Sequence, residues 1–148
     1  MKVLSALLAL LLLVSTACSP RAGSELSRHQ AAWRVAGIDH YRFDLHVGCF
    51  CVFSDRMPLS IEVLDGRAVS MAYNDGTPVP AAEQATFASY ATIDALFTFT
   101  ADAISRADEI KVSYETQYGF PSDVQIDFAR GAADDELTLS VTSFEALP

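Results

Sequence analysis

Cys49 and Cys51, separated only by Phe50, are the residues whose types and spacing best suit chemistry in this chain. Such a pair can form a disulfide, remain as buried free thiols, or serve redox chemistry or a soft metal such as Cu(I). In an ideal strand, residues two apart have Cα atoms roughly 6.6 Å apart, at the far edge of the disulfide range. A disulfide between them therefore requires a bend at Gly48 or a bulge.

The three histidines of the chain do not have the spacing of a metal site. His46 is near the cysteines, but strand alternation places it on the opposite face, so a metal site of His46, Cys49 and Cys51 needs a sharp turn. His40 beside Asp39 has the chemistry of a general base, but no serine in a Gly-x-Ser-x-Gly setting accompanies it. We therefore expect surface histidines, no cofactor and no enzymatic activity.

The run Asp134-Asp135-Glu136, with Asp127 nearby, carries carboxylates of the kind that bind Ca²⁺. The ligand spacing of an EF-hand loop is absent from the sequence. We favour a solvated acidic turn over a calcium site.

Tyr118 and Phe120, together with Phe144, are candidates for an exposed aromatic patch that contacts a partner. The competing interpretation is that these rings pack on the edge of a sheet, and we favour packing. Tyr118 and Phe120 are the candidate interaction residues if the patch is exposed.

The start of the chain has the layout of a secretory leader. Lys2 is followed by an apolar run over residues 4–14, by the small residues 15–17 and then by Cys18. The segment resembles a bacterial lipoprotein signal, which implies that Cys18 receives the lipid and becomes the first residue. The alternative is an ordinary signal peptide that is cleaved at another site.

These features set the expected domain boundaries. Residues 1–17 are predicted to be the signal peptide, residues 18–24 the lipidated cysteine with a flexible tether, and residues 25–148 a single domain. Ser19 resembles the sorting pattern of outer-membrane lipoproteins, so we expect that membrane if the host has one. The membrane is then a partner through the anchor, and an envelope protein is a further candidate partner.

The charge of the mature chain limits the classes of partner. Without Lys2, nine of the ten basic residues remain beside 19 acidic ones, a formal charge of −10. Such acidity disfavours nucleic acids and anionic lipid surfaces. An exported chain also meets oxidising conditions, which favours a disulfide between Cys49 and Cys51 while a redox or metal role stays open.

Apolar spacing predicts an α+β fold in the order helix–three strands–helix–three strands, with an antiparallel sheet and both helices on one face. Ser27 and Gln30 have the form of a capping box, so the first helix is expected from there to Ala36, with Trp33 packing it onto the domain. The second helix is expected to start after Thr92, a good N-cap. The expected strands are 41–47, 59–63, 69–73, 110–114, 124–128 and 137–141, with a loop over 74–91.

Five short motifs follow one another along the chain: Tyr41-Arg42-Phe43, Cys49-Phe50-Cys51, Tyr118-Gly119-Phe120-Pro121, Ile126-Asp127 and Ala133-Asp134-Asp135-Glu136. With these motifs the chain resembles, over residues 32–144, a bacterial family known only as domain of unknown function 6174. The family has no assigned activity. The resemblance therefore implies an extracytoplasmic protein and carries over no functional residues.

The sequence as a whole predicts a non-enzymatic, membrane-anchored lipoprotein of the bacterial cell envelope that serves as a binding or assembly module. The alternative prediction is an envelope protein that handles thiol redox chemistry or Cu(I) with the pair Cys49 and Cys51.

Overall fold

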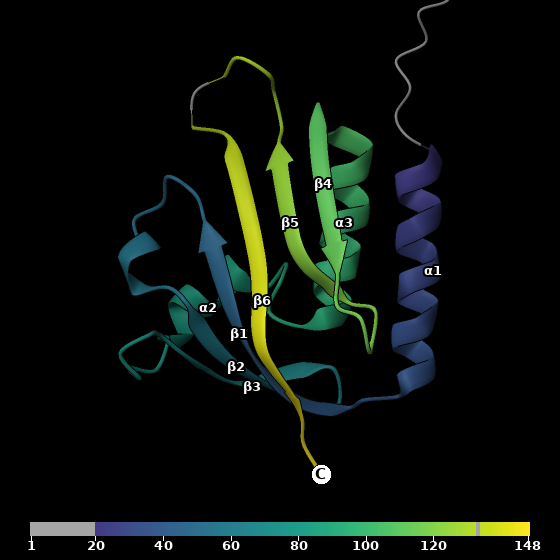
Figure 1. Ribbon diagram of the computed structural model, residues 1–148. Helices are drawn as coiled ribbons and strands as arrows, with labels where there is room; N and C mark the ends of the chain where they lie inside the picture. The colour runs from purple at the N-terminus through teal and green to yellow at the C-terminus, as the bar shows by residue number, and fades with distance from the viewer. Residues whose placement is uncertain (1–19, 133) are drawn as a thin grey trace, which may run out of the picture.

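The computed structural model describes residues 20–132 and 134–148, so the expected signal peptide and Cys18 lie outside the described residues. The described chain has an α+β fold with three α-helices and a six-stranded antiparallel sheet (Figure 1). The strands lie in the order β3-β2-β1-β6-β5-β4. The elements are α1 (Pro20–Ala36), β1 (His40–Gly48), the 3₁₀-helix η1 (Ser54–Arg56), β2 (Leu59–Leu64), β3 (Arg67–Ala72), α2 (Ala81–Phe87), α3 (Ile93–Arg106), β4 (Glu109–Tyr114), β5 (Pro121–Asp127) and β6 (Glu136–Ala146).

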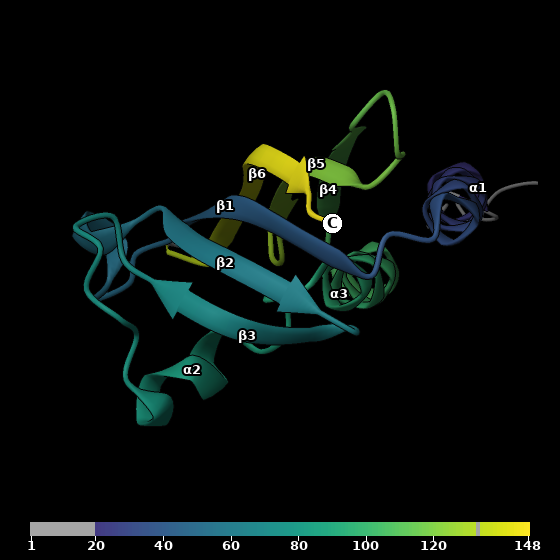
Figure 2. The same ribbon diagram turned by 90° about the horizontal axis from the view of Figure 1, so that it is seen from below.

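The core lies on one face of the sheet, and β1 shows how the sequence builds it. Tyr41, Phe43, Leu45 and Val47 are buried, whereas the residues between them are more exposed. This period of two confirms the strand predicted over residues 41–47. α3 lies behind β4 and β5 and contacts β5, so it covers part of the sheet (Figure 1). Figure 2 shows the strong twist between β1–β3 and β4–β6.

The start of α3 confirms the N-cap predicted at Thr92. Its side-chain hydroxyl accepts a hydrogen bond from the backbone N–H of Ala95, 3.1 Å away. Asp94 lies in the first turn, where a negative charge is favoured by the helix dipole. The buried face of the helix carries residues at helical spacing: Ile93, Leu96, Phe97, Thr100 and Ala103.

α1 is longer than the sequence predicts. It begins at Pro20, so the expected start at a capping box on Ser27 is wrong. The Ser27 hydroxyl instead donates to the carbonyl oxygen of Gly23, 2.9 Å away, as serine does inside a helix. Leu26 is buried and adds an apolar contact ahead of the expected start. Residues 20–24, expected within the flexible tether, are therefore helical.

Two further elements differ from the sequence prediction. α2 lies within residues 74–91, which the sequence predicts as a loop because of their glycine and prolines. The pairing of β2 with β3 shifts register between Glu62 and Val63, which leaves Val69 without a partner. Val69 is consequently 55% exposed, although the alternation of its strand predicts that it faces the core.

Candidate functional site

Residues 48–54 run from the last residue of β1 to the first residue of η1, project from one corner of the molecule and are called the tip loop below (Figure 1). Cys49 and Cys51 form a disulfide in this loop, with Cα atoms 5.2 Å apart. The distance is shorter than in an ideal strand because β1 ends at Gly48 and the chain then bends. The bond closes a small ring that spans the single residue Phe50.

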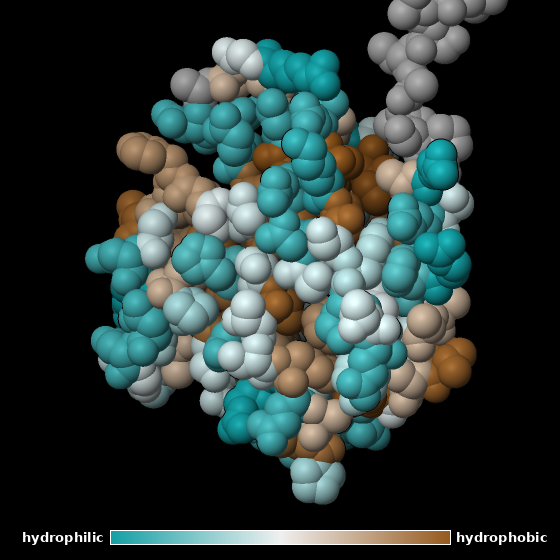
Figure 3. All heavy atoms as spheres, viewed as in Figure 1, coloured by the Kyte–Doolittle hydropathy of each residue, from teal (hydrophilic) through white to brown (hydrophobic). Residues whose placement is uncertain are grey.

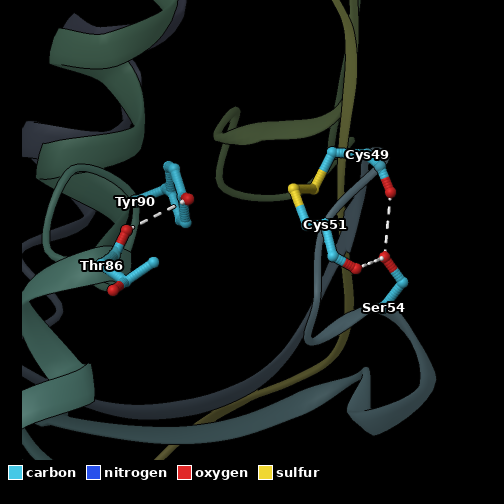
Figure 4. Close-up of a disulfide and its surroundings, with 5 residues drawn as sticks. All are labelled: Cys49, Cys51, Ser54, Thr86 and Tyr90. Atoms are coloured by element: carbon cyan, nitrogen blue, oxygen red, sulfur yellow. Dashed lines mark hydrogen bonds between the residues drawn. A yellow bond between two sulfur atoms is a disulfide. The ribbon is translucent and has the colours of Figure 1, made fainter. Parts of the chain in front are cut away.

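Ser54 holds the two ends of this ring together. Its hydroxyl lies 2.9 Å from the carbonyl oxygen of Cys49 and 2.7 Å from that of Cys51, and its one hydrogen is shared between these two acceptors (Figure 4). The backbone N–H of Ser54 also donates to the Cys51 carbonyl at 3.2 Å. The shape of the tip loop is thus fixed by hydrogen bonds as well as by the disulfide.

The tip loop presents two apolar side chains to solvent and turns a third inward. Phe50 is 87% exposed and Val52 is 100% exposed. Phe53 packs edge-on against Phe87 at the end of α2, with ring centroids 4.9 Å apart. Apolar surface accordingly projects from the molecule at this corner in the space-filling view (Figure 3). Apolar side chains held out on an ordered loop are suited to contact a partner.

The ring of Phe53 begins a row of aromatic side chains that leads from the tip loop to α3. Phe87 lies 6.5 Å from Tyr90, and Tyr90 lies 5.6 Å from Phe99, between ring centroids. The Tyr90 hydroxyl donates to the carbonyl oxygen of Thr86 at 3.3 Å (Figure 4). Burial raises the pKa of the Tyr90 phenol, so it stays neutral. These four rings, Phe53, Phe87, Tyr90 and Phe99, are called the aromatic row.

The aromatic row ends at an open depression on the outer side of α3. The depression has a volume of about 620 Å³ and is lined by Ser89, Ala95, Thr98, Phe99 and Asp102. We call it the α3 depression. Its lining combines an aromatic ring and small side chains, which is a composition that can hold an apolar side chain, and its one carboxylate pairs with Arg106.

The charged residues around the tip loop and α3 leave an excess of carboxylates. Arg56 lies 3.6 Å from Glu83, and Arg106 pairs with Asp102, so both arginines are engaged. Two exposed carboxylates of this region, Asp55 and Asp94, have no ion-pair partner among the described residues. The charges left without an ion-pair partner near the tip loop and at the start of α3 are therefore negative.

The histidines occupy other parts of the fold. His46 is exposed between the buried residues of β1, on the face opposite to the core, and no group of three metal-ligating residues occurs in the part of the chain that the structure describes. His40 lies 3.0 Å from the Glu62 carboxylate through Nε2 and 2.9 Å from the Pro148 carbonyl through Nδ1. The Glu62 hydrogen bond, followed by that of the Pro148 carbonyl, raises the pKa of His40.

Of the aromatic residues considered for a patch at Tyr118 and Phe120, Phe120 is buried and Tyr118 is only partly exposed. Phe120 is 1% exposed and packs against Trp33 and Phe144. Tyr118 is half-buried, with its ring centroid 5.4 Å from that of Phe144. Phe120 therefore cannot serve as an interaction residue, because α1 and β6 already cover it.

The acidic turn between β5 and β6 carries the carboxylates that the sequence suggested for Ca²⁺. Asp127 ends β5 and Glu136 begins β6, directly opposite each other in the ladder. Asp134 is exposed and adopts a positive φ of 69°. The described part of this turn contains no group of three carboxylates placed to hold one cation.

Among the described helices, none is long and apolar enough to cross a membrane.

Sequence reasoning identified the cysteine pair but missed the rest of the site. Ser54 carries a weak signal, since a serine soon after a turn commonly bonds nearby carbonyl oxygens. The exposure of Phe50 and Val52 depends on where β1 ends, which alternation does not reveal. The α3 depression carries no sequence signal, because it depends on how the segment after α2 meets α3.

Comparison with known proteins places the chain in a family. The model of the family of unknown function DUF6174 matches residues 25–146, from α1 to the end of β6. Because the match covers most of the chain, the chain belongs to this family. No curated protein and no solved structure matches it.

Proposed function

We propose that this member of the DUF6174 family is a non-enzymatic, membrane-anchored lipoprotein of the bacterial cell envelope that binds a partner protein through its tip loop. The observation that carries the proposal is the tip loop itself, in which Phe50 and Val52 are 87% and 100% exposed on a ring closed by the Cys49–Cys51 disulfide. Burying such a side chain in an interface contributes about 1.5–3 kcal/mol.

The order of the tip loop supports this role because it lowers the entropic cost of binding. A loop that is already held in its bound shape loses less conformational freedom when a partner covers it. Ser54 and the disulfide supply that order, and Phe53 fastens the loop to α2. α1 and α3 contact each other, and we take both to pack on the same face of the sheet. This arrangement leaves the tip loop uncovered.

The membrane anchor is the second part of the proposal. Cys18 directly follows the apolar leader, and α1 begins at Pro20, so a lipid on Cys18 would hold the first turn of the domain close to the bilayer. Two or more acyl chains give stable attachment. In a host with two membranes, the outer membrane is the proposed location.

Palmitate labelling tests the anchor. The expected result is incorporation of radiolabelled palmitate into the full chain and its loss in Cys18→Ser, which should also sediment less with membranes. Cys51→Ser serves as a matched control, since it also replaces a cysteine by serine but leaves the leader intact. Unchanged sedimentation of Cys18→Ser with membranes contradicts the anchor.

A double substitution tests the tip loop. Phe50→Ser with Val52→Ser should reduce the recovery of the proteins that cross-link to the full chain in its own envelope, measured by quantitative mass spectrometry. Val35→Ser is the matched control, because Val35 is also 87% exposed but lies on α1. Equal recovery with both variants contradicts docking at the tip loop.

A second candidate function is thiol redox chemistry or Cu(I) handling by Cys49 and Cys51. It is favoured by the position of the disulfide at the end of β1, where both cysteines are only partly buried. Titration of thiols in the folded protein, with and without reductant, distinguishes it from a purely structural bond. A disulfide that resists mild reductant, in a protein that binds no Cu(I) after reduction, eliminates this candidate.

A further inference from the structure

The α3 depression and the tip loop lie at opposite ends of the aromatic row, which packs against the core, with Phe87 only 1% exposed. The aromatic row joins them, with successive ring centroids 4.9, 6.5 and 5.6 Å apart from Phe53 to Phe99. The side-chain hydroxyl of Tyr90, in the middle of the row, is already bonded within the protein. Tyr90 is half-buried, so a partner that spans the tip loop and the α3 depression can contact its ring, and its hydroxyl needs no further hydrogen-bond partner.

We infer that the α3 depression is the second contact site of the partner that docks at the tip loop, and that it receives a bulky apolar side chain from a protein segment rich in lysine or arginine. The inference rests on the proposed function of the tip loop. It adds the chemical class of the partner and the place where its anchoring side chain binds.

The apolar part of the inference follows from the lining of the depression. Phe99 is half-buried and forms an aromatic wall, while Ala95 and Thr98 are too small to fill the space in front of it. The volume of about 620 Å³ is ample for one large side chain. Pockets of this kind, with an aromatic wall and few polar groups, typically hold the anchoring residue of a partner.

The basic part of the inference follows from charge. Asp102 in the lining already pairs with Arg106, so it supplies no free charge. The carboxylates without an ion-pair partner among the described residues are Asp94, one helical turn before Thr98, and Asp55 in η1 beside the tip loop. The whole chain carries a formal charge of −9. A second copy of the chain or an anionic bilayer would therefore be repelled, whereas a cationic protein segment would be attracted.

Binding of defined peptides to the full chain tests this inference. The full chain is placed in phosphatidylcholine nanodiscs, and the anisotropy of a short labelled peptide of Lys, Leu and Phe is measured with empty nanodiscs as the blank. The same peptide with Glu in place of Lys, and the same peptide with Ser in place of Leu and Phe, are each expected to bind at least about tenfold more weakly. Equal binding of all three peptides overturns the inference.

Substitution of Thr98 locates the binding site. Thr98 is exposed, and its hydroxyl donates to the carbonyl oxygen of Asp94 one turn earlier, so a longer side chain is tolerated there. Thr98→Lys adds bulk to the depression and a positive charge that repels the cationic peptide. It should weaken binding of the Lys, Leu and Phe peptide about tenfold. Thr98→Glu adds similar bulk without the repulsion and should weaken peptide binding less. Val35→Ser should leave peptide binding unchanged.

The outcomes separate this inference from the proposed function. If the double variant Phe50→Ser with Val52→Ser loses peptide binding while Thr98→Lys binds the peptide as well as Val35→Ser does, the depression is not a contact site. In that case only docking at the tip loop is supported. If Thr98→Lys weakens binding and the tip variant does not, docking at the tip loop fails. A dimer that Thr98→Lys abolishes, or binding to phosphatidylserine nanodiscs without peptide, overturns the assignment of a cationic protein partner.

Discussion

The backbone N–H of Ile93, the first residue of α3, donates to the buried hydroxyl of Tyr41 in β1, 3.0 Å away. The first N–H groups of a helix have no partner within the helix, so the neighbouring strand supplies one here. Thr92 satisfies the N–H of Ala95 in the same turn. Together these bonds fix where α3 begins, and they position the α3 depression relative to β1 and the tip loop that follows it.

Tyr41→Phe should lower the free energy of unfolding by about 1–3 kcal/mol, because the ring remains while the Ile93 N–H loses its acceptor. Tyr41 is 1% exposed, so water does not replace the hydroxyl. Thr92→Ala, which removes only the cap, should lower it by about 1 kcal/mol. Urea unfolding followed by circular dichroism measures both. Wild-type stability in Tyr41→Phe would show that the bond contributes nothing.

His40 should make the fold more stable in mild acid. Protonated His40 can donate from both ring nitrogens, to the Glu62 carboxylate and to the Pro148 carbonyl, and this raises its pKa above the ordinary 6.5. The added stability is therefore fully present below pH about 6.5 and is lost as the pH rises through the raised value. Asp39 adds a weaker electrostatic contribution in the same direction.

NMR titration of the His40 ring measures this directly. The His40 pKa should lie above 6.5, and Glu62→Gln should lower it, since the carboxylate hydrogen bond is the largest cause of the shift. His40→Gln should also remove the fall in stability that His40 causes as the pH rises from about 6.5 through its raised pKa. A pKa at or below 6.5 in the wild-type protein contradicts the bonding described here.

Loss of the disulfide should cost little global stability. The ring spans residues only two apart in sequence, so closing it removes little freedom from the unfolded chain, about 1.5 kcal/mol. Replacing both Cys49 and Cys51 by serine should leave the circular dichroism spectrum unchanged, because Ser54 still bonds the carbonyls of the loop. Unfolding of the domain on reduction would contradict a local role for the bond.

Trp33 should be the main attachment of α1. Its ring meets Tyr41, Phe120 and Phe144 edge-on, with centroids 5.5, 6.0 and 5.9 Å away. Trp33→Ala should lower the free energy of unfolding by about 3–5 kcal/mol. Val35→Ser on the same helix should change it by no more than about 0.5 kcal/mol, since Val35 is exposed. Similar denaturation midpoints for the two variants would contradict this packing.

The parts of the fold that sequence could predict are those governed by local periodicity. The alternation in β1 and the cap at Thr92 both follow from rules that act within a few residues. Asp65 and Gly66 both adopt positive φ, 50° and 73°, as a two-residue hairpin turn requires. These features needed no knowledge of the neighbouring elements.

The parts that sequence could not predict depend on contacts between elements. The first turns of α1 lack a strong periodic pattern, and Leu26 is buried only because the rest of the domain lies beside it. Val69 is turned out by a register shift against β2, which its own strand does not encode. Likewise, the exposure of Phe50 depends on β1 ending at Gly48.

Site-specific photo-cross-linking in the host's own envelope tests the central claim most directly. A benzophenone amino acid is placed at position 50, and at position 35 as the control, since both side chains are 87% exposed. Docking at the tip loop predicts a discrete protein adduct from position 50 and none from position 35. Equal adducts from both positions, or adducts with lipid alone from position 50, would contradict it.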